Sequence, residues 1–194
     1  MGSGKDTVGI WLVEMGVSTN TIAFADAVYQ VVNDVFGVAR TDKTNRGRLF
    51  RQQVGSHMRE ISQEVDGHRD VWINLVERKI SEDKVFAITD VRHLNEAEWI
   101  LEKMEGVLLF LLAPSELRQG RIQRRDHIEI NPKLWEKWSS HESERNVDRI
   151  FEKYKDHRSF ILFEMENDSF DENKEKLRKL LLKNGLISEL TECD

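Results

Sequence analysis

The first residues of the chain, Gly2-Ser3-Gly4-Lys5-Asp6-Thr7, form a pattern typical of the second half of a phosphate-binding loop. Glycines in such a loop let successive backbone N–H groups point into one concavity. The lysine reaches the β- and γ-phosphates, and the next helix directs its positive N-terminal end at them. Residues 8–15 carry apolar side chains at helical spacing and are followed by Gly16. A loop that opens directly into a helix favours a nucleotide-binding α/β fold.

The pattern differs from the complete motif in two ways. Asp6 stands where the complete motif has a Ser or Thr that contacts Mg²⁺, and Thr7 follows it. The leading glycine and the strand before it are absent from the sequence. We therefore expect the natural protein to begin about ten residues before Met1, with a first strand that this sequence lacks. A solvated N-terminal tail or an expression remnant is the alternative interpretation of residues 1–7.

Composition excludes several classes of protein. A length of 194 residues suffices for one domain with a substantial core. The formal net charge of −6 argues against binding to nucleic acid through bulk positive charge, so we expect no stable nucleic-acid partner. Cys193 is the single cysteine, which excludes a disulfide framework and favours the cytoplasm. Since no apolar run is long enough to cross a membrane, we expect no membrane partner.

Continuous apolar runs alternate with helical patterns along the chain. The runs predict buried strands over residues 84–89, 107–112 and 159–164, with a shorter strand over 19–25. Helical patterns cover residues 26–36, 43–64, 70–81, 94–104, 147–154 and 172–183 and a segment that begins at Ser115, whereas 126–145 is irregular or in short helices. This alternation predicts an α/β fold with a parallel sheet and helices on both faces. Ligands in such sheets bind at the carboxyl ends of the strands.

Charged residues follow the predicted strands at this edge. Asp90 closes a buried run, where a carboxylate can hold Mg²⁺ or its waters, or else cap a helix. Arg92 could contact a phosphate with two N–H groups, and its alternative partner is Glu96, one turn later. Asp26 follows the shorter strand and is expected to be the N-cap of the next helix.

Two groups of arginines are further candidates for phosphate contacts. The first comprises Arg46, Arg48, Arg51 and Arg59 in the predicted helix 43–64. As a group they favour a monophosphate site, although a solvated helix surface is the simpler interpretation of any one of them. The second group forms one stripe after Ser115 and comprises Arg118, Arg121, Arg124 and Arg125. Arginines on a mobile segment can neutralise charge during phosphoryl transfer, and the alternative is again a solvated helix.

Uncharged residues near the first arginine group could contact a base. Gln52 or Gln53 could hydrogen-bond to a base edge, whereas Trp72 could stack on a base or fill the core. His127, His141 and Glu144 match no strong metal-binding template, so we expect no metal site there.

Taken together, these segments resemble the phage-type deoxynucleoside monophosphate kinase family, which belongs to the P-loop kinases. The segments that carry the resemblance lie in family order and are residues 1–8, 24–26, 48–60, 72–73, 89–96, 141–144 and 167–168. The pairing of Gly-Ser-Gly-Lys-Asp-Thr with Thr89-Asp-Val-Arg92 is the most specific part. One departure is Tyr29, which stands where the family often has a lysine.

The resemblance implies a three-layer α/β/α P-loop kinase fold and ATP- and Mg²⁺-dependent phosphorylation of a deoxynucleoside monophosphate. A single domain would span residues 1–194, with an acceptor-binding helical region at about 38–81 and a lid-like region at about 115–146. Gly2 to Thr7 would bind ATP, and Thr7 and Asp90 would contact the metal. Catalytic roles would fall to Lys5, Arg92, Arg121 and Arg125, and acceptor contacts to Asp26, Arg48, Gln53, Arg59, Trp72 and Arg92. A phage protein of this kind would act in the host cytoplasm. The resemblance leaves open whether the protein forms a homodimer.

The residues themselves are also compatible with two other functions. Asp6 and the incomplete loop suit a degenerate or truncated P-loop protein that binds nucleotide without catalysis. The same loop also suits a kinase with another acceptor, such as dephospho-coenzyme A.

Overall fold

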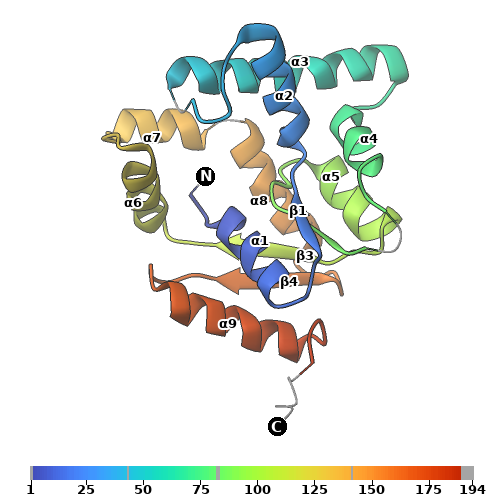
Figure 1. Ribbon diagram of the computed structural model, residues 1–194, viewed down its shortest axis with the longest axis vertical. Helices are drawn as coiled ribbons and strands as arrows, with labels where there is room; N and C mark the ends of the chain where they lie inside the picture. Colours follow the sequence, from blue (N-terminus) through green and yellow to red (C-terminus); the bar gives the residue numbers. More distant parts are fainter. Residues whose placement is uncertain (1, 43, 82–83, 141, 189–194) are drawn as a thin grey trace.

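The computed structural model describes residues 2–42, 44–81, 84–140 and 142–188, and is rich in helices with a few parallel strands between them (Figure 1). It therefore has the α/β character that the alternating sequence pattern predicts. The expectations about Met1, His141 and Cys193 lie outside the described residues.

The elements follow the predicted order closely. They are α1 (Lys5–Glu14), β1 (Asn20–Ile22), α2 (Ala25–Phe36), α3 (Asn45–Asp66), α4 (Val71–Glu77), β2 (Phe86–Ile88), α5 (Leu94–Glu98), the π-helical segment η1 (Trp99–Lys103), β3 (Leu108–Leu112), α6 (Ser115–Asp126), α7 (Pro132–Ser139), α8 (Glu142–Tyr154), β4 (Phe160–Glu164) and α9 (Phe170–Lys183).

Two local predictions are wrong. Helix α2 begins before Asp26, so this residue is not the N-cap; its Oδ2 instead accepts the N–H of Ala23 at 3.0 Å. Helix α8 begins five residues before the predicted position, Val147.

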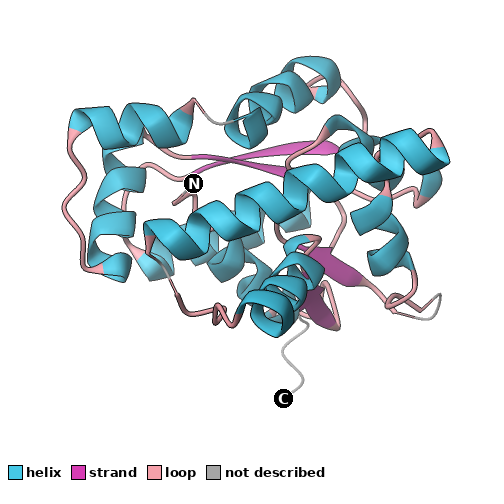
Figure 2. Cartoon of the chain, turned by 90° about the horizontal axis from the view of Figure 1, so that it is seen from above, coloured by secondary structure: helices cyan, strands magenta, loops and turns pink. Residues whose placement is uncertain are grey.

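The strands pair in parallel, as predicted, but the described residues divide them between two sheets. Strand β1 pairs with β2, with Asn20 opposite Phe86, and β3 pairs with β4, with Leu108 opposite Phe160. Figure 2 shows the two strand pairs in separate parts of the molecule. The single sheet expected from the sequence is therefore not formed by these residues, and the three-layer arrangement stays a prediction.

Helix α1 packs on both sheets. A Cβ at Gly9 would lie 2.6 Å from the Thr89 side chain at the end of β2, so only glycine lets α1 approach that sheet so closely. Val8 and Trp11 on the same helix belong to a buried cluster with Phe163 of β4 and Leu177 of α9. The short loop before α1 is consequently held near the middle of the molecule (Figure 1).

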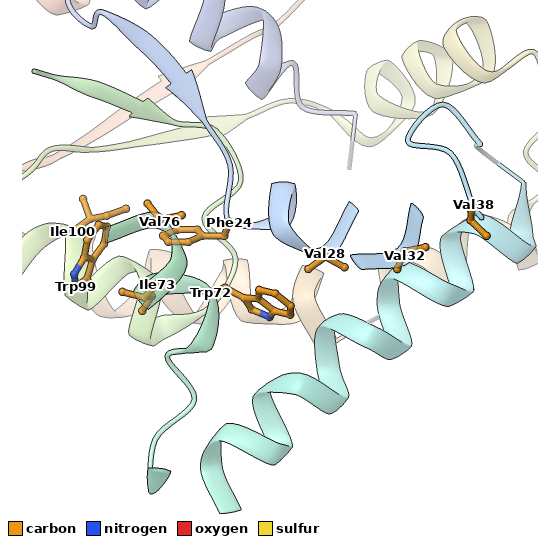
Figure 3. Close-up of a cluster of buried hydrophobic side chains, with 9 residues drawn as sticks. All are labelled: Phe24, Val28, Val32, Val38, Trp72, Ile73, Val76, Trp99 and Ile100. Atoms are coloured by element: carbon orange, nitrogen blue, oxygen red, sulfur yellow. The ribbon is translucent and has the colours of Figure 1, made fainter. Parts of the chain in front are cut away.

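A second buried cluster fixes the N-terminal helices (Figure 3). Val28 and Val32 of α2 belong to this cluster together with Trp72 of α4, and Trp99 and Ile100 of η1 lie at its other end. The ring of Trp72 is only 2% exposed, and its Nε1 donates to the Gly55 carbonyl of α3 at 3.2 Å. Because this bond satisfies the buried indole N–H, α3 is held firmly against α4.

The predicted lid-like region has its own small core of Ile122, Ile130 and Trp138, contributed by α6, α7 and the loop between them. Among the described residues, no helix combines the length and the apolar character that a membrane span requires.

Candidate functional site

A cavity of about 960 Å³ lies where the loop before α1 meets α2, α3, α6 and the end of β2. This volume is at the upper end of the range for small-molecule sites, about 300–1,000 Å³. Most of the predicted site residues line it, namely Gly2, Ser3, Gly4, Lys5, Asp6, Thr7, Arg48, Arg59, Asp90, Arg92, Arg121 and Arg125. The fold thus brings together side chains from most of the chain length.

Three predicted site residues do not line this cavity. Trp72 lies in the core, so its position does not support stacking on a base. Gln53 is exposed, and its neighbour Gln52 faces the cavity instead, because adjacent residues on a helix point in different directions. Asp26 forms an ion pair with Arg40 at 2.7 Å, and only the arginine lines the cavity.

The loop at residues 2–7 owes its shape to glycine. Gly2 and Gly4 have φ angles of +68° and +84°, in the left-handed region that other residues rarely adopt. A Cβ at Gly2 would also lie 2.6 Å from the Arg118 carbonyl oxygen, so α6 abuts the loop backbone. The Gly4 carbonyl accepts the N–H of Val8 at 2.9 Å and starts α1. A glycine loop leading into a helix N-terminus is a suitable cradle for phosphate oxygens.

Lys5 contacts its neighbour Asp6, with 2.5 Å between Nζ and Oδ1. The lysine side chain is 32% exposed and the aspartate 69% exposed, so water screens this pair strongly. A bound phosphate would compete with Asp6 for the lysine. Lys5 is therefore available to an anionic ligand at small cost.

Asp90 connects the end of β2 to the start of α2. Its Oδ1 accepts the N–H of Phe24 at 2.7 Å and its Oδ2 that of Ala25 at 2.8 Å. Burial raises the pKa of the Asp90 carboxyl, and these backbone N–H groups oppose the rise. The carboxylate thus has a structural role in the free protein, which its place after a strand did not reveal.

The described residues contain no group of three or more His, Cys, Asp or Glu side chains that could hold a metal ion. Thr7 and Asp90 line the same cavity and offer one hydroxyl and one carboxylate. That donor set fits Mg²⁺ only in the usual way for nucleotide sites, where ligand phosphates and waters supply most of the contacts.

A buried ion pair joins α3 to α5. The Glu96 side chain is 2% exposed and accepts Arg59 Nη2 at 2.9 Å and the backbone N–H groups of Arg92 and His93 at 2.8 and 3.0 Å. Burial raises the pKa of the Glu96 carboxyl, and Arg59 works against the rise. The guanidinium of Arg92 contacts Glu144 of α8 instead. Glu96, the alternative partner of the Arg92 side chain, therefore contacts the backbone of Arg92 and not its guanidinium.

Arg51 stands out among the arginines that line the cavity. Its Nη2 donates to the Asp42 carbonyl, and its guanidinium lies 5.1 Å from the centre of the Tyr29 ring. Within the described part of the chain it has no carboxylate partner, and its buried Nη1 has no hydrogen-bond partner. The sequence placed Arg51 in a basic group but gave no reason to single it out. A buried guanidinium nitrogen with no hydrogen-bond partner in the described residues is a candidate contact for an anion.

Helix α6 presents Arg121 and Arg125 to the cavity. Arg121 contacts Asp168 through Nε at 2.8 Å and the Gly2 carbonyl through Nη1 at 3.4 Å. It thereby connects the loop, α6 and the segment after β4. The arginine stripe predicted from the sequence is consequently part of the cavity wall at two of its four positions.

No protein-family model matches the chain, and the curated proteins include no significant match.

Proposed function

We propose that the protein transfers the γ-phosphoryl group of ATP to a deoxynucleoside or nucleoside monophosphate. The supporting observation is that one cavity has a glycine loop with Lys5 on one side and arginines with buried partners on the other. Phosphoryl transfer needs two anionic ligands held close together, and catalysis consists mainly of positioning and charge neutralisation.

The loop of Gly2 to Thr7 would bind the ATP phosphates through backbone N–H groups and Lys5. Arg92, Arg121 and Arg125 would neutralise charge on the group in transfer. Bound Mg²⁺, near Thr7 and Asp90, would supply further neutralisation of the phosphates. In this proposal the domain is a three-layer P-loop kinase, and it acts on nucleotides in the cytoplasm.

The acceptor phosphate would lie beside Arg51, with Arg48 and Arg59 nearby on α3. Arg59 already has the buried Glu96 as partner, whereas the free Nη1 of Arg51 lacks one among the described residues. An acceptor phosphate would supply a hydrogen-bond partner for this nitrogen. The acceptor-binding region at about 38–81 and the lid-like region at about 115–146 then lie on different sides of one cavity.

A nucleotide-binding protein without catalysis is the second candidate. Asp6 occupies the position of the metal-binding hydroxyl and pairs with Lys5 in the free protein. Both oxygens of Asp90 are also engaged by backbone N–H groups. A kinase that uses another acceptor, such as dephospho-coenzyme A, would have the same loop.

The test is ATP-to-ADP turnover with Mg²⁺ across deoxynucleoside and ribonucleoside monophosphates and dephospho-coenzyme A. We expect turnover with a subset of the nucleotides. Lys5→Ala should lower it on the order of 10²-fold, because one charged donor to the phosphates is lost. Lys174→Ala, which removes a surface pair with Glu14, is the control and should leave turnover unchanged. ATP binding with no turnover for any acceptor would support the non-catalytic candidate.

A further inference from the structure

Asp126, the last residue of α6, holds two arginines from distant parts of the sequence. Its side chain is 0% exposed. It accepts Arg125 Nε at 2.8 Å and Nη2 at 2.9 Å, and it also accepts Nη2 of Arg48, a residue of α3 that lies 78 positions earlier. No sequence pattern singles out Asp126.

The three side chains occupy different places relative to the cavity. Arg48 and Arg125 are among the residues that line it, and Asp126 is not. Arg48 also lies over the ring of Trp138 on α7, with its guanidinium carbon 4.6 Å from the ring centre. The two cations therefore belong to the cavity wall, whereas the carboxylate lies behind that wall.

This arrangement fixes the arginines before any ligand binds. Arg125 makes paired hydrogen bonds with the Asp126 carboxylate, and these define the plane of its guanidinium. Arg48 is held by a hydrogen bond to Asp126 and by its position over the Trp138 ring. A free arginine side chain would lose much of its rotamer freedom when a ligand orders it. With Asp126 in place, that ordering has already occurred on folding.

We propose that Asp126 is a positioning residue that orients Arg48 as an N–H donor to a phosphate group of the nucleotide acceptor and Arg125 as an N–H donor to the phosphoryl group in transfer, and that it joins α6 to α3. The identity of the ligand rests on the proposed function. The orientation of the arginines rests on the contacts alone.

Charge and geometry predict opposite results when Asp126 is neutralised. If Asp126 merely competed with ligands for the arginines, its removal would leave a more positive cavity and tighten anion binding. If Asp126 positions the arginines, its removal leaves two poorly ordered side chains and weakens anion binding. The sign of the change therefore decides between the two roles.

The experiment titrates inorganic pyrophosphate into the full chain by calorimetry, for the wild type, Asp126→Asn and Asp126→Glu. We expect Asp126→Asn to weaken pyrophosphate binding about tenfold, equivalent to one charge-assisted hydrogen bond. Asp126→Glu keeps the carboxylate and should recover part of the loss. Asp148→Asn, which neutralises an exposed aspartate of α8, is the matched control and should bind as the wild type does.

Arg48→Gln extends the test in case Asp126→Asn fails to fold. We expect Arg48→Gln to weaken pyrophosphate binding, and Asp126→Asn to add less in that background than in the wild type, because the two residues act through one contact. In turnover assays, Asp126→Asn should raise the KM for the acceptor more than the KM for ATP.

Unchanged or tighter pyrophosphate binding by Asp126→Asn would overturn the proposal, as would equal losses with and without Arg48. Absence of pyrophosphate binding by the wild type would overturn it as well. A wild type that binds pyrophosphate with the expected variant effects, yet turns over no acceptor, would sink the proposed kinase activity and leave the positioning role of Asp126 intact.

Discussion

The two sides of the cavity are built on different principles. On the loop side, glycine conformation shapes the wall, and Lys5 pairs with Asp6, whose side chain is exposed to solvent. On the arginine side, buried carboxylates hold the cations, Glu96 beside Arg59 and Asp126 beside Arg48. The loop side therefore takes its shape mainly from adjacent glycines, with α6 packed against it, whereas the arginine side depends on buried carboxylates that the fold brings to its cations.

The largest expected effect is a loss of stability when the buried ion pair on the arginine side is broken. Glu96→Gln removes the charge that balances the buried Arg59, and we expect it to lower the free energy of unfolding by about 3–5 kcal/mol. The loop-side counterpart, Asp6→Asn, should change it by less than about 0.5 kcal/mol, since exposed pairs contribute little. Urea unfolding of both variants measures the difference. Similar losses for the two would contradict the contrast between the sides.

A second prediction concerns the loop backbone. Gly2→Ala places a Cβ at positive φ and 2.6 Å from the Arg118 carbonyl oxygen, so we expect both strain and a displaced loop. Gly37→Ala is the matched control, because Gly37 has a φ of +64° with nothing within 4 Å of the added Cβ. Each should lose about 1–2 kcal/mol of stability from strain. Binding of an ATP analogue should weaken only in Gly2→Ala, and equal binding would argue against the loop as the donor site.

Arg51→Gln tests the acceptor end with a smaller expected effect. We expect the KM for the acceptor to rise about tenfold, the loss of one charged hydrogen bond, with little change in the KM for ATP. Arg46→Gln, an exposed arginine of the same helix, is the control. Steady-state kinetics with each substrate varied in turn measures both constants. An equal effect of the two variants would remove Arg51 from the acceptor site.

The smallest expected effect depends on pH. The hydrogen bonds from Arg125 lower the pKa of Asp126 in the folded protein. Such a group stabilises the fold above its unfolded pKa, about 3.9, and loses that contribution as the pH falls through the lower folded pKa. The stability difference between the wild type and Asp126→Asn should therefore be largest near neutral pH and shrink below about pH 4. Unfolding curves from pH 3 to pH 7 would reveal a constant difference if this is wrong.

Sequence patterns were sufficient where the structure depends on neighbours in the chain. The glycine loop, the start of α1 and the parallel strands all follow from local composition and spacing. The group of arginines predicted on α3 also pointed to the cavity wall, since Arg48, Arg51 and Arg59 all line the cavity.

The remaining features depend on contacts between residues far apart in the sequence. Arg59 and its partner Glu96 are 37 positions apart, and periodicity cannot pair them. Burial placed Trp72 in the core, although an aromatic residue beside a basic helix also suits a base site. The division of the strands between two sheets likewise depends on which edges meet in space.

The proposed phosphoryl transfer requires that this cavity hold two nucleotides at once. Calorimetric titration of each of the common 2′-deoxynucleoside 5′-monophosphates into the protein saturated with Mg²⁺ and a non-hydrolysable ATP analogue tests this requirement. We expect one of these acceptors to bind while the analogue stays bound, with Arg51→Gln weakening only the acceptor and Lys5→Ala only the analogue. If every acceptor displaces the analogue, or none binds beside it, the cavity does not hold two nucleotides and the proposed transfer is wrong.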